Sequence, residues 1–326
     1  MLKSKLNYWR RIISAYRRGA NSQLTFWHEV PTINKDMNFK DPFTGYYMTF
    51  YDKTLYPGPF DDRGVPMLDY KGVIGRQYNP IAIAQYGLGF YNRYVKEKKE
   101  EYLNKFLVQC DWLVDNLEKN KYGLYVWMHH FDWEYFRTLK SPWYSSLAQG
   151  AGISALVRAY IITNDSKYIE SASKAFKSFN KAIEDGGVVY YDRNGDVWFE
   201  EAITIPPTHI LNGFIWSLWG IYDYYLLTKE AKIEELFKRA VNTIKNNLPK
   251  YDTGYWSLYD LAPTKLKMLA SPFYHSLHIV QLRILNKITG EQVFSEFANR
   301  WDMYQRNSYY RRKALVKKML FKLLYY

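Results

Sequence analysis

Apolar residues recur at helical spacing in four stretches of the chain, and a proline stands at the start of each one. The prolines lie 62, 65 and 65 residues apart, at Pro80, Pro142, Pro207 and Pro272. Because proline is favoured in the first turn of a helix, each is expected to open an apolar helix. A more charged helical segment follows each one, over residues 99–119, 165–184, 229–248 and 291–305. The pattern predicts four helical hairpins, each with one buried and one solvated helix.

Two of these hairpins also share sequence. Ser141-Pro-Trp-Tyr-Ser-Ser-Leu and Ser271-Pro-Phe-Tyr-His-Ser-Leu have the common pattern Ser-Pro-aromatic-Tyr-x-Ser-Leu. A long repeat whose single unit cannot bury its apolar face is typical of hairpins arranged around an axis. We therefore expect a mainly α fold, an α/α toroid (an incomplete barrel) of about four hairpins over residues 76–306. Its inner helices should begin at the same end, so the loops before them should meet in one cleft.

The segments outside the repeat have a different character. Residues 40–75 alternate aromatic and polar residues between glycines and prolines, which predicts a small β-hairpin region lying against the main body. The start of residues 1–39 and the whole of residues 307–326 place apolar residues at helical spacing with basic residues between them. We expect a basic amphipathic helix at each end, the first one followed by an arm.

The two ends carry most of the net charge of +13. Residues 1–28 hold six Lys or Arg residues, residues 311–326 hold six more, and neither stretch contains an acid. Basic amphipathic helices bind anionic membrane surfaces, and no stretch reaches the roughly 18 apolar residues of a membrane-spanning helix. The expectation is therefore a cytoplasmic protein, peripheral to the inner face of a membrane. The alternative is a pair of helices packed on the protein surface or in a subunit contact, and a homodimer built through them stays open.

Composition argues against several kinds of site. The one cysteine, Cys110, lies on an apolar helix face and has no partner for an internal disulfide. The six histidines form neither an HExxH motif nor a cluster with cysteine, so no metal site is expected. No dinucleotide fingerprint is present, and we expect no cofactor and no nucleic-acid partner. The aromatic content of 19% suits a carbohydrate cleft, and it suits a large core equally well.

Four potential proton carriers lie within twenty residues around the start of the last apolar helix: Tyr259, Tyr274, His275 and His278. Each alone is as typical of a core residue with a polar tip as of a site residue. Their concentration at the mouth of a helix favours a site.

A pair of carboxylates, Glu200 and Glu201, precedes Pro207. Paired carboxylates act as acid and base or bind sugar hydroxyls. Neighbours on a strand point to opposite faces, so one functional member is enough.

The first apolar helix adds a third group, Gln85 and Tyr86 with Tyr91, where tyrosine is more often a core residue. Arg76 precedes that helix and is expected to bind a substrate carboxylate. Near the same rim, Arg158, Lys265 and Lys267 are further candidates for that role, with solvation favoured for the two lysines.

Several segments, in order over about residues 40–305, resemble the D-glucuronyl C5-epimerase family. They are Ala82-x-Ala-Gln-Tyr-Gly-Leu88, Ser141-Pro-Trp-Tyr-Ser-Ser-Leu-Ala-Gln-Gly, Leu156-Val-Arg-Ala-Tyr160, Trp198-Phe-Glu-Glu, Leu211-Asn-Gly-Phe, Tyr259-Asp-Leu, Tyr274-His-x-x-His-Ile and Phe297-Ala-Asn-Arg-Trp301. The best-known members convert glucuronate to iduronate within heparosan, and their C-terminal domain is an α/α barrel. The resemblance therefore implies an isomerase that acts on a polysaccharide.

The resemblance also assigns residues. It implies catalytic roles for Glu201, Tyr259 and Tyr274 and a place in the cleft for Tyr91. Tyr144 and Asn212 lie inside matched segments and join the expected substrate-binding residues, which also include Tyr86, Arg76, Glu200, His275 and His278. The chain departs from the family at Ala202, where the family has a tyrosine. It also lacks the β-sandwich insertion that animal enzymes carry after the segment matching residues 80–91.

The implied reaction removes the proton at C5, next to the carboxylate, and returns a proton to the opposite face. We expect Tyr274 on one face, Glu201 or Tyr259 on the other, and His275 or His278 as an orienting group. A tyrosine base requires a lowered pKa, which we attribute to burial beside a cation or an imidazole.

Three alternatives stay open. They are a uronan lyase acting by β-elimination, a glycoside hydrolase, and a non-catalytic, membrane-docked glycan-binding protein. The expected partner is a uronate-containing polysaccharide or a lipid-linked oligosaccharide.

Overall fold

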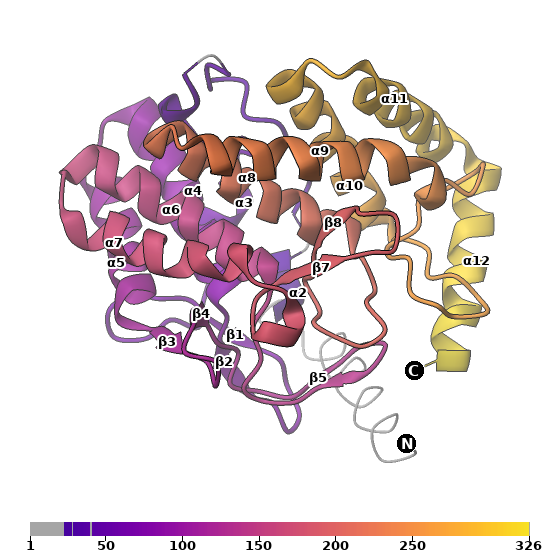
Figure 1. The fold of residues 1–326 in the computed structure, drawn as a ribbon, viewed down its shortest axis with the longest axis horizontal. Coiled ribbons are helices and arrows are strands. Elements are labelled where there is room, and N and C mark those ends of the chain that lie inside the picture. Colours follow the sequence, from indigo (N-terminus) through magenta and orange to yellow (C-terminus); the bar gives the residue numbers. More distant parts are fainter. Residues whose placement is uncertain (1–22, 28, 40, 326) are drawn as a thin grey trace.

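The computed structural model describes residues 23–27, 29–39 and 41–325 of the chain. Within these ranges, four helical hairpins follow one another around an axis (Figure 1). They are α4 (Pro80–Glu97) with α5 (Glu100–Asp115), α6 (Ser146–Thr163) with α7 (Ser166–Phe176), α8 (Leu211–Thr228) with α9 (Ala231–Tyr251), and α10 (Pro272–Thr289) with α11 (Gln292–Arg306). The predicted mainly α toroid is confirmed.

The inner helices α4, α6, α8 and α10 form the wall of the ring, and neighbours in this order pack against each other, α6 and α8 most closely. Glycines bring α6 and α8 together. A Cβ at Gly220 would lie 2.3 Å from the carbonyl oxygen of Gly150, and one at Gly150 would lie 2.5 Å from Cα of Ser217. The two backbones therefore touch where any larger residue would hold them apart.

Two of the four prolines begin their helices as expected. Pro80 and Pro272 occupy the first turn of α4 and α10, behind the capping side chains of Asn79 and Ser271. The expectation is wrong for the other two, because α6 begins at Ser146 and α8 at Leu211. Ser145 caps α6 through its hydroxyl, which accepts a hydrogen bond from the amide of Ala148 at 3.0 Å. Capping, and not the proline, fixes that boundary.

The predicted helix within residues 1–39 falls largely outside the described residues, which begin with the short α2 (Gln23–Trp27). The prediction of a β-hairpin region over residues 40–75 is only partly right. The hairpin joins β1 (Met67–Asp69) to β2 (Arg76–Tyr78), and before it come η1 (Pro42–Thr44) and α3 (Tyr51–Thr54).

Residues 33–39 and 41–50, called the plug from here on, close the far end of the ring, where the inner helices end. The side chain of Asn92, late in α4, binds the amide of Tyr46 at 2.6 Å, and the hydroxyl of Tyr47 donates to Asp223 of α8 at 2.6 Å. Tyr46 and Tyr47 are fully buried against Trp219. Their aromatic rings fill the core instead of alternating along a strand.

Arg158 lies at this far end as well, so its expected place near the rim of the cleft is wrong. Its guanidinium forms an ion pair with Asp223 at 2.6 Å, and both side chains are fully buried. Its Nε also donates to the carbonyl of Gly45 at 3.0 Å. This cation ties the plug of the ring to α6 and α8.

The opposite end of the ring, where the inner helices begin, carries three antiparallel hairpins. They are β3 (Leu117–Lys119) with β4 (Tyr125–Trp127), β5 (Trp133–Glu134) with β6 (Thr138–Leu139), and β7 (Val189–Tyr191) with β8 (Val197–Phe199). The turns η2 (Lys177–Asn180) and η3 (Ile183–Asp185) precede β7. The last helix, α12 (Ser308–Tyr325), follows α11 and stands at the right edge in Figure 1. It buries Ala314 and Phe321 against the body.

Candidate active site

A cavity of about 340 Å³ lies at the end of the ring where the inner helices begin. Each inner helix contributes residues near its first turn, as the common direction of the helices predicts. The side chains that line it from these helices are Ile81, Gln85, Leu147, Asn212, Trp216, Phe273, Tyr274 and Leu277. Loops, α2, α3, β5 and α12 supply the rest, among them Lys53, Tyr70, Trp133, Glu134, Tyr135, Glu201, Tyr259, Met268, Lys318 and Lys322. A cavity of this size and largely aromatic lining suits a sugar ring.

Glu201 reaches the cavity from the loop after β8 and rests against the first turn of α8. Asn212 donates to its carboxylate at 3.4 Å. The next residue must be glycine, because a Cβ at Gly213 would lie 2.1 Å from Oε2 of Glu201 and 2.6 Å from its Cβ. Burial raises the pKa of Glu201 to about 8, and the charge of Glu200 adds to the effect. This carboxyl can therefore hold or release a proton near neutral pH.

Tyr259 and Tyr274 stand edge to face beside Glu201, with their ring centroids 4.9 Å apart. Burial raises the pKa of both phenols, and the charge of Glu201 raises both further. The expectation that burial beside a cation or an imidazole lowers a tyrosine pKa here is wrong. Both hydroxyls are protonated near neutral pH, so each can donate a proton or a hydrogen bond.

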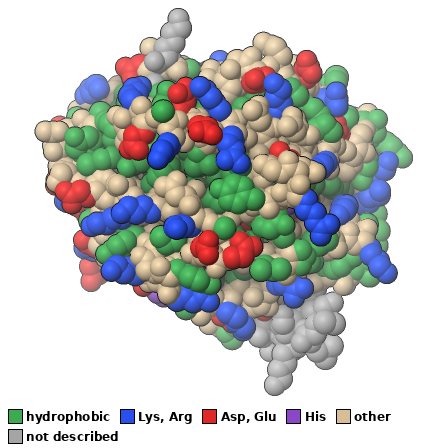
Figure 2. Space-filling model, viewed as in Figure 1, with side chains coloured by type: hydrophobic (Ala, Val, Ile, Leu, Met, Phe, Trp, Pro, Cys, Tyr) green, Lys and Arg blue, Asp and Glu red, His purple; other side chains and the backbone are tan. Residues whose placement is uncertain are grey.

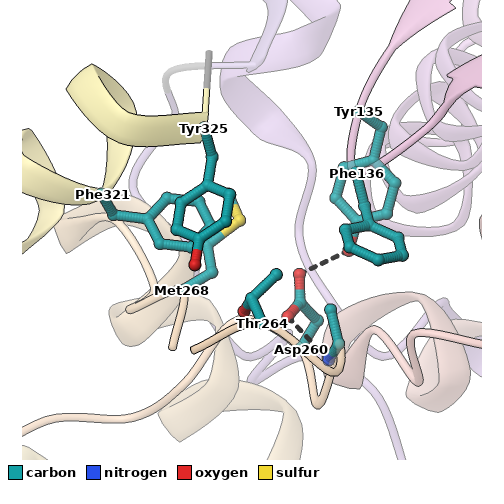
Figure 3. Close-up of a pocket in the computed structure, with 8 residues that line it drawn as sticks. Tyr135, Phe136, Asp260, Thr264, Met268, Phe321 and Tyr325 are labelled. Carbon is teal, nitrogen blue, oxygen red and sulfur yellow. Dashed lines mark hydrogen bonds between the residues drawn. The ribbon is translucent and has the colours of Figure 1, made fainter. Parts of the chain in front are cut away.

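A smaller pocket of about 70 Å³ adjoins this group between the β5–β6 turn and α12 (Figure 3). It shares Tyr135 and Met268 with the larger cavity. The hydroxyl of Tyr135 donates to the carboxylate of Asp260, which is 2% exposed. Burial raises the pKa of Asp260. Phe321 and Tyr325 of α12 form the opposite wall.

Two buried amides in the cavity wall have polar atoms with no hydrogen-bond partner in the described part of the chain. They are both side-chain polar atoms of Gln85 and Oδ1 of Asn212. An unsatisfied buried polar atom is costly unless a ligand or water completes it. Sugar hydroxyls are suitable partners for both amides.

Glu200 does not line the cavity. Its carboxylate accepts hydrogen bonds from the amides of Thr208 and His209 at 3.3 and 3.2 Å and contacts Nδ1 of His209 at 2.6 Å. Glu200 stabilises the loop between β8 and α8, whereas Glu201 faces the cavity.

The two histidines are buried behind the site instead of facing the cavity. His275 stacks on Trp256 at 3.8 Å, donates from Nε2 to the carbonyl of Trp301, and meets the hydroxyl of Ser257 at Nδ1. The same hydroxyl lies 3.0 Å from Nδ1 of His278. Burial lowers the pKa of His275 to about 4 and that of His278 well below its ordinary value. Both are neutral, and they support α10.

Four other expected substrate-binding residues lie away from the cavity. Tyr91 is buried and donates to the carbonyl of Phe43, and Tyr144 donates to the carbonyl of Gly186 at 2.8 Å. Tyr86 packs between the rings of Phe60 and Phe90. Arg76 is exposed on β2. Of the expected residues, the structure brings together Gln85, Glu201, Asn212, Tyr259 and Tyr274.

Three lysines line the cavity, and the sequence reasoning named none of them for the site. Lys53 is fully engaged: it pairs with Glu29 at 3.4 Å, donates to the carbonyl of Phe26, and lies over aromatic rings. Lys318 and Lys322 come from α12, whose basic pattern indicated a membrane helix. The sequence did contain a signal for their direction. Ala314 and Phe321 are apolar and share a helical face with Lys318, which indicates that this face packs against the body.

No group of three or more His, Cys, Asp or Glu side chains is placed to hold a metal ion among the residues that the structure describes. None of the helices in that part of the chain is long and apolar enough to cross a bilayer.

A family model and a relative of known activity indicate the same family. The family model described as D-glucuronyl C5-epimerase C-terminus matches residues 119–303. A D-glucuronyl C5-epimerase from Caenorhabditis elegans is 37% identical over 225 residues, which are 64% of this chain and 36% of that protein. An uncharacterized protein from Methanocaldococcus jannaschii is 28% identical over 267 residues, covering 75% of this chain and 85% of that protein. The chain thus matches about a third of the length of the worm enzyme.

A solved structure shares the fold. It is an α-1,6-mannanase of Salegentibacter sp. HEL1_6 in complex with α-1,6-mannotriose, with a TM-score of 0.53 and 16% identity over 78% of this chain and 68% of that one. At this level of identity the likeness concerns the fold alone.

Proposed function

The chain belongs to the family of D-glucuronyl C5-epimerase C-terminal domains, and from that premise we propose that it inverts C5 of D-glucuronate residues within a glycan to give L-iduronate. The observation that carries the proposal is the placing of Glu201, Tyr259 and Tyr274 in one cavity. The reaction needs a proton acceptor on one face of the sugar and a proton donor on the other. A carboxyl with a pKa near 8 and a protonated phenol supply these two functions.

In the first step, ionised Glu201 takes the C5 proton, and the electron pair of the C–H bond moves into the uronate carboxylate. About a tenth of the molecules hold Glu201 ionised at pH 7 if its pKa is about 8. In the second step, Tyr274 gives its phenolic proton to C5 from the opposite face. The product leaves with the inverted centre.

The site then returns to its starting state. Glu201 releases the proton that it took, and Tyr274 regains one from water. Tyr259, in edge-to-face contact with Tyr274, is placed to pass that proton on. The raised pKa of Tyr274 makes its phenolate strongly basic, so its reprotonation is favourable.

We propose a heparosan-like polymer as the first substrate to test, because heparosan is the substrate of the best-known members of this family. Ala202, which is buried where the family has a tyrosine, removes one proton donor from the site. This difference affects which glycan is used more than the reaction. A different glucuronate polymer or a lipid-linked oligosaccharide would use the same groups.

The test is to incubate heparosan with the protein in heavy water and to measure deuterium at C5 by mass spectrometry and NMR. The expected result is deuterium incorporation together with iduronate signals. Both should be lost in Glu201→Gln, whereas Tyr274→Phe should lose the iduronate signals because the donor on the opposite face is gone. An unsaturated product absorbing in the ultraviolet would show a lyase, and new reducing ends would show a hydrolase. No exchange with any glucuronate polymer would reject the epimerase.

We also propose that the outer face of α12 binds an anionic membrane surface. Val316, Leu320 and Leu323 lie on the side of the helix opposite the buried Ala314 and Phe321, and each is at least half exposed. Figure 2 shows hydrophobic side chains between Lys and Arg side chains along the right edge, where α12 runs. The helix contains no acid.

The positive charge of α12 indicates which partner its outer face binds. Residues 1–28 and a second copy of α12 are also basic and free of acids, so they would be repelled. A polysaccharide would leave the leucines in water. An anionic lipid surface satisfies both the cations and the apolar side chains. Such attachment would place the site beside glycan assembly at the cytoplasmic face of the membrane.

Sedimentation with vesicles tests this attachment. The protein should pellet with vesicles of phosphatidylcholine and phosphatidylglycerol, and binding should fall with salt and on Leu320→Glu combined with Leu323→Glu. Pure phosphatidylcholine is the control. Equal binding of the wild type and the double variant would reject α12 as the membrane contact.

A further inference from the structure

We propose that Lys318 of α12 binds the carboxylate of the uronate and so acts as a specificity-determining residue of this site. The inference rests on the proposed function, which makes the substrate a uronate. Lys318 lies beyond residues 119–303, which the family model matches, so the comparison assigns it no role.

Removal of the C5 proton sends negative charge onto the neighbouring carboxylate. A cation or hydrogen-bond donors must meet that charge, because the cavity wall is largely apolar and already holds the carboxyl of Glu201. Among the described residues, the cations lining the cavity are Lys53, Lys318 and Lys322. Lys53 is already paired with Glu29, so α12 supplies the candidates.

The position of Lys318 fits the role. Its Nζ lies 5.7 Å from the centre of the Tyr259 ring, and Tyr259 in turn contacts Tyr274. The ammonium donates one hydrogen bond to the carbonyl of Leu269, its only hydrogen bond within the described residues. An ammonium has three donors, so two are available for a carboxylate. Lys322 lies one helical turn farther along α12.

The surroundings hold Lys318 in place. Ala314 and Phe321, on the same helical face, are buried against the body. Burial lowers the pKa of Lys318 to about 8, and nearby Asp260 acts in the opposite direction. The ammonium is therefore mainly charged at neutral pH and weakly solvated, a state in which a carboxylate partner is strongly favoured.

The inner face of α12 thus belongs to the site, and its outer face is the proposed membrane contact. The two faces are separable by mutation, because Lys318 and Leu320 point in different directions from the helix axis.

Calorimetric titration with two ligands tests the inference. One is a heparosan hexasaccharide, and the other is the same hexasaccharide with its carboxyl groups reduced to alcohols. The wild type should bind the acidic ligand more tightly. Lys318→Met should weaken binding of the acidic ligand about tenfold to a hundredfold, as expected for a charged hydrogen bond, and leave the reduced ligand unchanged.

Two variants control the experiment. Lys317→Met removes an equal charge from an exposed neighbour on α12 and should bind both ligands like the wild type. Lys318→Arg should restore part of the preference for the acid. Melting temperatures of all variants show whether the fold is kept.

The outcomes separate the two proposals. Unchanged preference for the acid in Lys318→Met, an equal loss for both ligands, or no preference in the wild type would each overturn the role of Lys318. A wild type that prefers the acid through Lys318 and yet exchanges no deuterium at C5 would instead reject the epimerase and keep the carboxylate site.

Discussion

Gly213→Ala should disable the site while leaving the fold intact. Gly213 occupies the third position of α8, directly under Glu201. An added Cβ would lie 2.1 Å from Oε2, 2.6 Å from Cβ and 2.9 Å from Cδ of Glu201. Rotating the carboxylate cannot relieve these contacts, because the Cβ atom of Glu201 is itself too close. The loop that carries Glu201 has to move.

The structure sets the size of the effect. An ordinary contact between nonbonded carbon atoms is about 3.5–4.0 Å. The contact between the two Cβ atoms therefore requires a shift of about 1 Å. A displacement of about 1 Å in a catalytic group costs about a hundredfold in rate. Alanine in a helix gains up to about 1 kcal/mol over glycine, which offsets part of the strain of about 1–3 kcal/mol.

The assay is deuterium exchange at C5 together with thermal unfolding. We expect exchange to fall about a hundredfold and the melting temperature to change by only a few degrees. The double variant with Glu201→Gln should be no slower than Glu201→Gln alone, because both changes act on one group. Wild-type exchange in Gly213→Ala, or losses that multiply in the double variant, would refute this account of the site.

Three further predictions follow from charge and burial. Exchange should rise with pH up to about 8, because Glu201 accepts a proton only when ionised and its pKa is raised to about 8, and it should fall at higher pH, where Lys318 loses its charge; a flat profile from pH 6 to 9 would contradict this. The same shift should make Glu201→Gln more stable than the wild type at alkaline pH. The unfolded carboxyl ionises near 4.5 and the folded one near 8, so wild-type stability falls across that window, and the gap in melting temperature should widen from pH 5 to pH 8. Asp223→Asn should cost about 3–5 kcal/mol in urea unfolding, because it leaves the buried charge of Arg158 without its counter-ion, and a loss below about 1 kcal/mol would show that the pair is dispensable.

The periodic part of the fold could be predicted from sequence because one local pattern recurs four times. The outer helices fall within a few residues of their expected bounds, apart from the shorter α7, which ends at Phe176. The plug of the ring could not be predicted. Its aromatic residues, such as Tyr46 and Tyr47, belong to a stretch whose mixture of aromatic and polar residues is typical of strands, and only their packing against Trp219 of α8 shows that they enter the core.

The site was predictable where its residues stand at the starts of the inner helices or in the loops before them. Glu201, Tyr259, Tyr274 and Asn212 follow from that rule and from the family resemblance. His275 and His278 lie at the start of the same helix as Tyr274, so the sequence offers no reason to treat them differently. Only the orientation of α10 shows that Tyr274 faces the cavity and the histidines do not. Lys318 was missed because its charge matched a membrane helix and its inward direction depends on how α12 docks.

The direction of the tyrosine pKa shifts could not be predicted from the sequence either. The residues near a phenol can be guessed from sequence, but the sign of the shift depends on whether cations or burial and carboxylates dominate. Here burial dominates, and Glu201 adds to it at both Tyr259 and Tyr274. That outcome changes the proposed chemistry, because it favours the carboxyl of Glu201 over a phenol as the base.

A carboxyl base and an anionic substrate repel each other, and the charges in the cavity have to resolve this conflict. A uronate arriving beside ionised Glu201 would place two negative charges in a largely apolar space, which favours reprotonation of the base. Glu201 protonated in the empty site avoids that repulsion during binding, but it leaves no base for the reaction. A cation held on the substrate carboxylate lets Glu201 ionise while the uronate is bound. Lys318 lies beside Tyr259, so in the proposed mechanism it would connect recognition of the acid to activation of the base.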